Sequence, residues 1–200
     1  YSTQEIYLGE IDKRSLRLPV VRDELQHHSV GCYTAESELK KGNRTAETAL
    51  ITAEKISASG SVIWGCSCPR DEFTAAWKRI LLMQFHDSLA GTSLPEHSAT
   101  AREAFGRAGD VAGQAMYLAV QGLAWQVPAD DPDYQYLFVF NPHPWDISGN
   151  IEYDLSLDQD KTTTAEDEKG NRILHQWAPG TTETGNRKRF VTRLQVPAFG

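Results

Sequence analysis

Apolar residues recur at helical spacing in three stretches of the first two thirds of the chain. From about residue 35 to 58 they fall at steps of three, four and seven, which predicts an amphipathic helix that ends at Gly60. A second helix is expected to begin near Asp71, just after Pro69, and a third to span about 98–125. Helices of this length predict a compact antiparallel three-helix bundle.

The pattern changes in the last third of the chain, after a Pro- and Asp-rich stretch at 128–132. The apolar run Tyr136–Phe140 predicts a strand, and residues 151–155 and 189–196 alternate between apolar and polar, as half-buried strands do. The Asn-Pro-His-Pro run at 141–144 cannot continue a helix or a central strand. This region therefore predicts the opening of an antiparallel β-sandwich.

Together these patterns predict an α+β multidomain fragment, in which the three-helix bundle is followed by part of the sandwich. The expected parts are a connecting segment with poor periodicity at 1–34, a helical middle domain at 35–127, and the start of the β domain at 134–200. The chain opens on Tyr1 without an initiator methionine and ends at Gly200 in a strand-and-turn region, so we expect a piece of a longer protein.

Composition narrows the class of partner. The 200 residues include 27 acidic and 20 basic side chains, for a formal net charge of -7, so we expect neither nucleic acid nor anionic lipid as a partner. No run of about 18 apolar residues occurs, so no membrane span is expected. Cys32, Cys66 and Cys68 are an odd, small set, which argues against a disulfide framework and favours a reducing, cytoplasmic location.

The most informative local feature is the pair His86–Asp87, which lies at the end of the second predicted helix, before a break at Gly91. A neutral imidazole is a common metal ligand, and a carboxylate can bind the same ion or accept hydrogen bonds from hydroxyls. At 3.6 residues per turn, His86 lies nearly half a turn from the apolar stripe of Trp77 and Leu81, so we expect its ring to point away from the bundle. Taken alone, a surface histidine at a helix end is the more ordinary explanation.

Four short motifs follow one another along the chain. They are Gly31–Thr34 with Lys40–Arg44 and Glu47; Ala76–Lys78 with Gln84–Asp87 and Gly91–Thr92; Leu137–Trp145; and Val196–Gly200. In this order they resemble the glycoside hydrolase family 38 α-mannosidases, and the second motif is specific in that context. Asp23, Ala35 and Met83 depart from the residues common in the family, which indicates a divergent subgroup.

The resemblance implies a retaining α-mannosidase that hydrolyses terminal α-mannosides of glycans and holds a zinc ion in its active site. It implies that His86 is one zinc ligand and that Asp87 contacts the bound sugar. The remaining ligands, the nucleophile and the general acid would lie on the protein's own upstream catalytic domain, so no catalytic residue is expected here. The expected partners are that domain and a mannose-containing oligosaccharide, and homo-oligomerisation is left open.

A non-catalytic interpretation also stays open, in which the segment is a scaffold or interaction module and the His-Asp pair is incidental. A parallel α/β domain upstream, with a His-x-Asp near its start, would distinguish the two. Adjacent His27 and His28 would point to opposite faces of an extended segment, so they are not expected to share an ion. No partner is expected for His97, His143 or His175, and we assign them no role.

Overall fold

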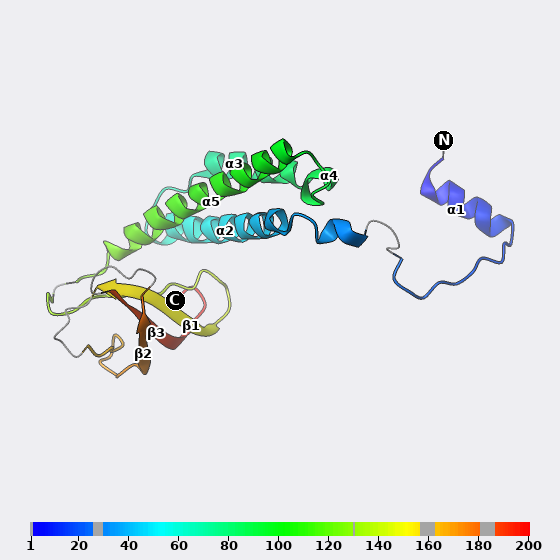
Figure 1. The fold of residues 1–200 in the computed structure, drawn as a ribbon. Helices are drawn as coiled ribbons and strands as arrows, with labels where there is room; N and C mark the ends of the chain where they lie inside the picture. Colours follow the sequence, from blue (N-terminus) through cyan, green and yellow to red (C-terminus); the bar gives the residue numbers. More distant parts are fainter. Residues whose placement is uncertain (1, 26–29, 130, 157–162, 181–186) are drawn as a thin grey trace.

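The computed structural model describes residues 2–25, 30–129, 131–156, 163–180 and 187–200. A helical part is followed by a small antiparallel sheet (Figure 1), so the predicted α+β class is confirmed. Among the described residues, none of the helices combines the length and the apolarity that crossing a bilayer would require.

The first long helix, α2, spans Ser37–Ile63 and is longer than predicted. Gly60 does not end it, because this glycine is buried inside the last turns. A Cβ atom there would lie 2.5 Å from Cys66 Sγ and 2.8 Å from the Trp64 ring. The glycine therefore serves close packing against the returning chain, which sequence spacing alone does not distinguish from a helix stop.

The other helices follow at short intervals. Helix α3 spans Arg70–Met83, the single-turn helix α4 spans His86–Leu89, and α5 spans Pro95–Ala124. Asp71 lies in the first turn of α3 and does not cap it, because the N-cap residue is Pro69. Proline occupies the first turn of α5, where its missing N–H would be unpaired in any helix.

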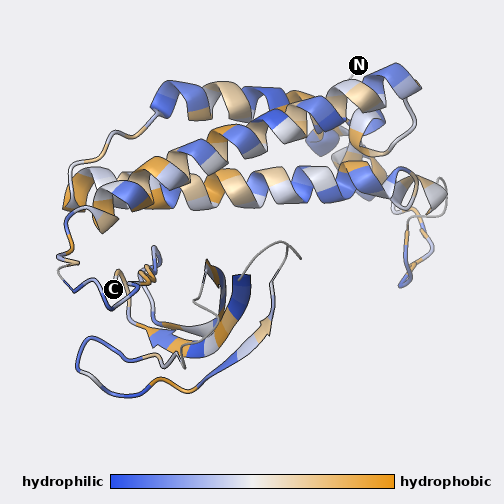
Figure 2. Ribbon diagram, turned by 60° about the vertical axis from the view of Figure 1, so that its left-hand side comes forward, coloured by the Kyte–Doolittle hydropathy of each residue, from blue (hydrophilic) through white to orange (hydrophobic). Residues whose placement is uncertain are grey.

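Helices α2, α3 and α5 share one apolar core. Figure 2 shows hydrophobic and hydrophilic residues alternating along these helices, as expected when each buries one side. Many core side chains are alanine, which lets the helix axes approach closely, and a Cβ atom at Gly42 would lie 2.9 Å from the Phe105 ring. The buried set is Leu39, Ala46, Leu50, Ala53, Phe73, Ala76, Ile80, Met83, Ala101, Phe105, Ala108, Ala112 and Ala115.

The first part of the chain contains a helix that the sequence pattern did not predict. Helix α1 spans Gln4–Lys13 and buries none of its residues. Thr3 caps it, because its hydroxyl oxygen accepts a hydrogen bond from the Ile6 N–H. A short 3-10 helix, η1, spans Val30–Tyr33 just before α2. Figure 1 shows α1 standing apart from the other helices. Local capping therefore forms this helix without the apolar stripe that would have predicted it.

The sheet contains three strands in the order β1-β3-β2, all antiparallel. Strands β1 and β3 span Ile147–Ser156 and Arg187–Val196, which confirms both alternating segments. Strand β2, His175–Pro179, was not predicted. The predicted strand at 136–140 is wrong, because this stretch has no regular structure. Phe140, at its end, instead packs against the helical part, where it meets Trp64 edge-on with ring centroids 5.5 Å apart.

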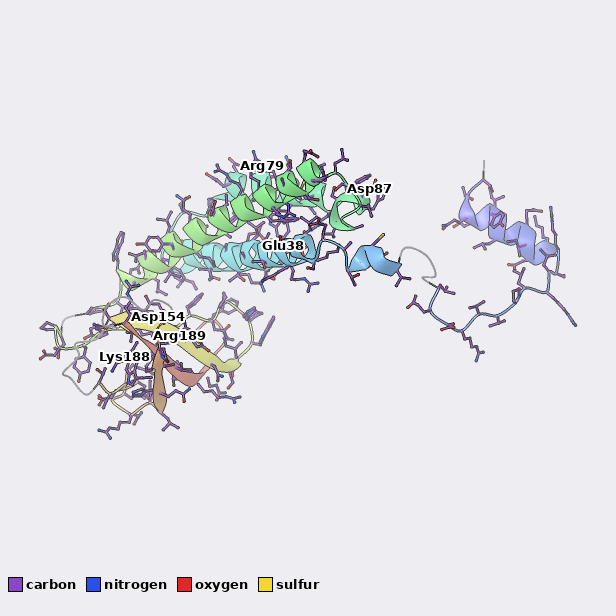
Figure 3. All side chains as sticks on the ribbon, in the orientation of Figure 1. Glu38, Arg79, Asp87, Asp154, Lys188 and Arg189 are labelled. Carbon is purple, nitrogen blue, oxygen red and sulfur yellow. The ribbon has the colours of Figure 1, made fainter. Side chains whose placement is uncertain are left out.

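The two faces of the sheet differ in character. On one face Trp177 and Phe190 are cross-strand partners with ring centroids 5.5 Å apart. On the other, Arg189 Nε donates to Asp154 at 3.0 Å and Arg189 Nη1 to Glu152 at 3.3 Å (Figure 3). The Asp154 carboxylate raises the pKa of Arg189, so this cation stays charged. One face is therefore built for packing and the other for solvent.

Candidate functional site

The His86–Asp87 pair lies at the end of the helical part that is remote from the sheet. Figure 3 labels Asp87 there, on α4, and shows the chain arriving from α1 on the same side. Helix α3 ends at Met83, Gln84 and Phe85 form a turn, and His86 opens α4. The sequence pattern placed the pair at the end of a continuous helix, whereas the structure places it on a separate turn that redirects the chain.

The His86 ring faces solvent. Its side chain is 77% exposed and lies beside the Phe85 ring, with centroids 4.2 Å apart. The predicted outward orientation is therefore confirmed. The stripe used to derive it was partly wrong, because Leu81 is 55% exposed and does not fill the core.

Asp87 lies next to this ring, with Oδ2 3.4 Å from His86 Nε2. The two groups form an exposed ion pair when the ring is protonated, which contributes little stability. Among the described residues, no group of three or more His, Cys, Asp or Glu side chains could hold a metal. The described residues therefore do not form a complete metal site around this pair.

A polar cluster fixes the residue that precedes this turn. The Gln84 side-chain amide donates to Asn43 Oδ1 at 3.0 Å and to Glu47 Oε1 at 2.8 Å, both on α2. Asn43 is buried, so its carbonyl oxygen needs a donor. All three belong to the motifs noted above. They connect the end of α3 to α2 and so set the direction in which the chain enters α4.

A second set of contacts holds the exit of α4. Lys40 is half-buried, and its ammonium group donates to the backbone oxygens of Cys32 and Ala90 at 3.1 Å each, and also to that of Ala35. Arg102 Nη2 lies 3.0 Å from Glu36 Oε2, and Glu36 packs against Gly91. These contacts join the start of α2 to the loop after the His-Asp pair.

Sequence reasoning missed a partner of the same turn. Ser88 is 3% exposed, and its Oγ lies 2.5 Å from Nε2 of His97 in the first turn of α5. His97 was expected to have no partner, which is wrong. The sequence offered little sign of this contact, because the two residues lie nine positions apart. The predicted third helix also began only at about residue 98, after His97.

The other histidines also have neighbours. His143 stacks on Trp145 with centroids 4.7 Å apart, and its Nδ1 lies 3.5 Å from Lys55 Nζ. His175 Nδ1 lies 2.9 Å from the Ile173 carbonyl oxygen, and its ring contacts Trp177. The expectation that neither has a partner is wrong. His27 and His28 lie outside the described residues.

The last two motifs meet at one buried amide. The Asn141 side chain donates to the carbonyl oxygens of Trp145 at 2.8 Å and Pro197 at 2.9 Å, and its backbone N–H donates to Gly200 O at 2.9 Å. Asn141 is fully buried. Motifs that are about 55 residues apart in sequence therefore form one structural unit at the edge of the sheet, remote from His86.

Known proteins match both the helical part and the whole fold. Residues 26–123 match the family model of the alpha mannosidase middle domain. Alpha-mannosidase 2C1 of Homo sapiens is 28% identical over 120 residues, which cover 58% of this chain and 11% of that protein. Alpha-mannosidase of Saccharomyces cerevisiae is 36% identical over 66 residues, which cover 32% of this chain and 6% of that protein.

Two solved structures share the fold. A glycosyl hydrolase family 38 protein from Enterococcus faecalis superposes with a TM-score of 0.62 at 19% identity, covering 100% of this chain and 26% of that chain. An alpha-mannosidase from Enterococcus faecalis V583 gives a TM-score of 0.60 at 20% identity, covering 98% of this chain and 26% of that chain.

A helical domain that leads into a β region is the fold that this chain shares with both solved structures. The chain is similar to the α-mannosidases of glycoside hydrolase family 38, and its residues 26–123 match the model of the alpha mannosidase middle domain. It spans 11% of the length of the human relative that it matches and 26% of the matched Enterococcus chain.

Proposed function

We propose that this chain is part of a retaining, zinc-dependent α-mannosidase that hydrolyses terminal α-mannosides of glycans. In this proposal His86 supplies one zinc ligand and Asp87 contacts the bound sugar. The observation that carries it is the exposed imidazole on a turn held in place by the motif residues, within a chain similar to this family's members. The names of the relatives support the activity and the substrate class.

The chemistry divides between this chain and the upstream catalytic domain. A retaining glycosidase uses two carboxylates about 5–5.5 Å apart, one as nucleophile and one as acid and base, and we place both upstream. Bound zinc would hold sugar hydroxyls and favour a distorted ring. On this chain, His86 would present a ring nitrogen, and the Asp87 carboxylate would accept hydrogen bonds from hydroxyls. The turn orients both groups.

The finer points of the fold belong to the same proposal. Helices α2, α3 and α5 would form the three-helix bundle of the middle domain, and the sheet would be one half of a β-sandwich. The half-covered apolar face around Trp177 supports the second point, because a sandwich buries such a face against another sheet. The free cysteines Cys32, Cys66 and Cys68 support a cytoplasmic location.

The test uses the full-length protein. His86→Ala should remove most of the bound zinc and the turnover of an aryl α-mannoside, measured by metal analysis and initial rates. Asp87→Asn should keep the zinc and raise KM or lower kcat, because it weakens a substrate contact. Asp110→Asn, an exposed change on α5, is the matched control and should alter neither quantity. Wild-type zinc and turnover in His86→Ala would refute the assignment and favour a non-catalytic module.

A further inference from the structure

The turn that carries His86 and Asp87 is too short to hold its own shape. Helix α4 has four residues, and a helix of one turn is not stable in water without outside contacts. The Gln84 cluster fixes the chain before the turn, and Lys40 with Gly91 fixes it after Leu89. The turn itself needs an anchor between these points.

Ser88 is the residue of α4 that is buried. It directly follows Asp87, and its hydroxyl oxygen lies 2.5 Å from His97 Nε2. His97 is a firm support, because it lies in the first turn of the 30-residue helix α5 and its backbone N–H donates to Leu94 O at 3.0 Å. The contact therefore joins the four-residue helix α4 to α5, a long helix of the core.

We propose that the Ser88–His97 hydrogen bond is a positioning device that sets the orientation of the His86 ring and the Asp87 carboxylate. Ser88 and His97 are positioning residues, since neither would touch the metal or the sugar. When a helical turn is fixed at one residue, its two preceding side chains can reach only a narrow set of directions. This inference rests on the proposed function for the metal, but the rigidity of the turn can be measured without any metal.

Loss of the Ser88–His97 hydrogen bond should destabilise helix α4 more than it destabilises the fold as a whole. Ser88→Ala removes a single oxygen atom, so the space that it leaves is too small to disturb the packing of the core. The change also leaves the half-buried His97 ring without its hydrogen-bond partner Ser88. The large apolar side chains that hold α2, α3 and α5 together are unchanged. A displaced ligand weakens a metal site even when the ligand itself is retained.

The experiment compares Ser88→Ala, His97→Ala and His97→Gln in the full-length protein, with Thr100→Ala as control. Thr100 lies one turn further along α5, and its hydroxyl donates only within that helix, to Glu96 O at 3.0 Å. Amide hydrogen exchange of residues 86–92 is measured on the zinc-free protein. Zinc affinity is measured by competition with a chelator, and kcat and KM on an aryl α-mannoside.

Ser88→Ala and His97→Ala should each increase exchange at 86–92 about tenfold and weaken zinc binding roughly tenfold. The double variant Ser88→Ala/His97→Ala should show the same exchange rate and the same zinc affinity as either single variant, because both changes remove the same hydrogen bond. His97→Gln should recover much of both values, since its amide can bond to the serine hydroxyl. Thr100→Ala should behave as wild type.

Wild-type exchange at 86–92 in Ser88→Ala would overturn the inference, and so would faster exchange spread evenly over all the helices. The inference and the proposed function fail in different ways. If His86→Ala keeps its zinc, the proposed function fails whatever the exchange data show. If His86→Ala loses zinc while Ser88→Ala keeps both its zinc affinity and its slow exchange, the positioning role alone fails.

Discussion

At the scale of single residues, the loop after the His-Asp pair depends on Gly91. Its φ is +76°, in the left-handed region that favours glycine, and a Cβ atom there would lie 2.7 Å from Glu36 Cβ. Glu36 cannot move freely, because it has a φ of 47° before α2 and forms an ion pair with Arg102. The conformation and the neighbour therefore both exclude a side chain.

Gly91→Ala should lower the free energy of unfolding by at least about 1–2 kcal/mol, the cost of a left-handed conformation for a residue with a Cβ atom. The measurement is chemical denaturation of the full-length protein. Gly106→Ala is the matched control, because Gly106 is exposed in α5 with no atom within 4 Å of the added Cβ. There the same change should stabilise the helix by roughly 0.5–1 kcal/mol. Effects of equal sign at the two positions would contradict this account.

At the scale of elements, the turn between residues 166 and 172 is organised by one carboxylate. Asn171 donates from its side chain to Asp167 Oδ2 at 2.9 Å and from its backbone to Oδ1 at 2.8 Å. Lys169 N–H also donates to Oδ1 at 2.9 Å. The hydrogen bond from the Asn171 side chain, followed by those from the backbone, lowers the pKa of Asp167 below its ordinary value.

The sign of the pH dependence follows from this shift. Because the pKa of Asp167 is lower in the folded turn than in the unfolded chain, its stabilising effect is complete above the unfolded value of about 3.9 and is lost as the pH falls through the folded pKa. A carboxyl titration by NMR should give a midpoint below 3.9 in the wild type. Asn171→Ala should raise that midpoint toward the ordinary value. An unchanged midpoint would contradict the proposed cause.

The elements that the sequence predicted correctly are those whose pattern was set by burial. The periodic apolar residues of α2 and α5, and the alternation in β1 and β3, reflect faces that pack on one core or one sheet side. The failures have a common physical origin. Helix α1 is stabilised locally without a buried face, and the apolar run at 136–140 does not pair as a strand but ends in Phe140, which packs against Trp64.

The candidate site was predictable only in part. The side chain of His86 is exposed as helical periodicity predicted, although His86 lies on the separate turn α4 and not on a continuation of α3. Its roles and those of Asp87 stay predictions. The supports of the turn were not predictable, because the bonds from Gln84 to Glu47 and from Ser88 to His97 depend on how separate helices meet. Periodicity fixes the face of a residue, but not the partner across an interface.

At the scale of the whole molecule, Trp64 joins the helical part to the β part. Its indole N–H donates to Ala119 O on α5 at 2.9 Å, and its carbonyl oxygen accepts a hydrogen bond from the Gln126 side chain at 2.9 Å. Its ring meets Phe140 edge-on at 5.5 Å, just before the buried Asn141. Trp64, at the end of α2, therefore contacts α5, the residues just after it and the segment that leads to the sheet.

Trp64→Ala should destabilise the full-length protein by about 3 kcal/mol, the low end for a buried tryptophan, because this ring is half-buried. It should also separate the unfolding of the helical and β parts, since it removes the packing that couples them. Two transitions in calorimetry, where the wild type is expected to show one for this region, would demonstrate the separation. Trp64→Phe keeps an aromatic ring and loses the bond to Ala119, so it should cost only about 1 kcal/mol and leave the transitions joined. Joined transitions in Trp64→Ala would place the coupling elsewhere, with the Lys55–His143 contact as the next candidate.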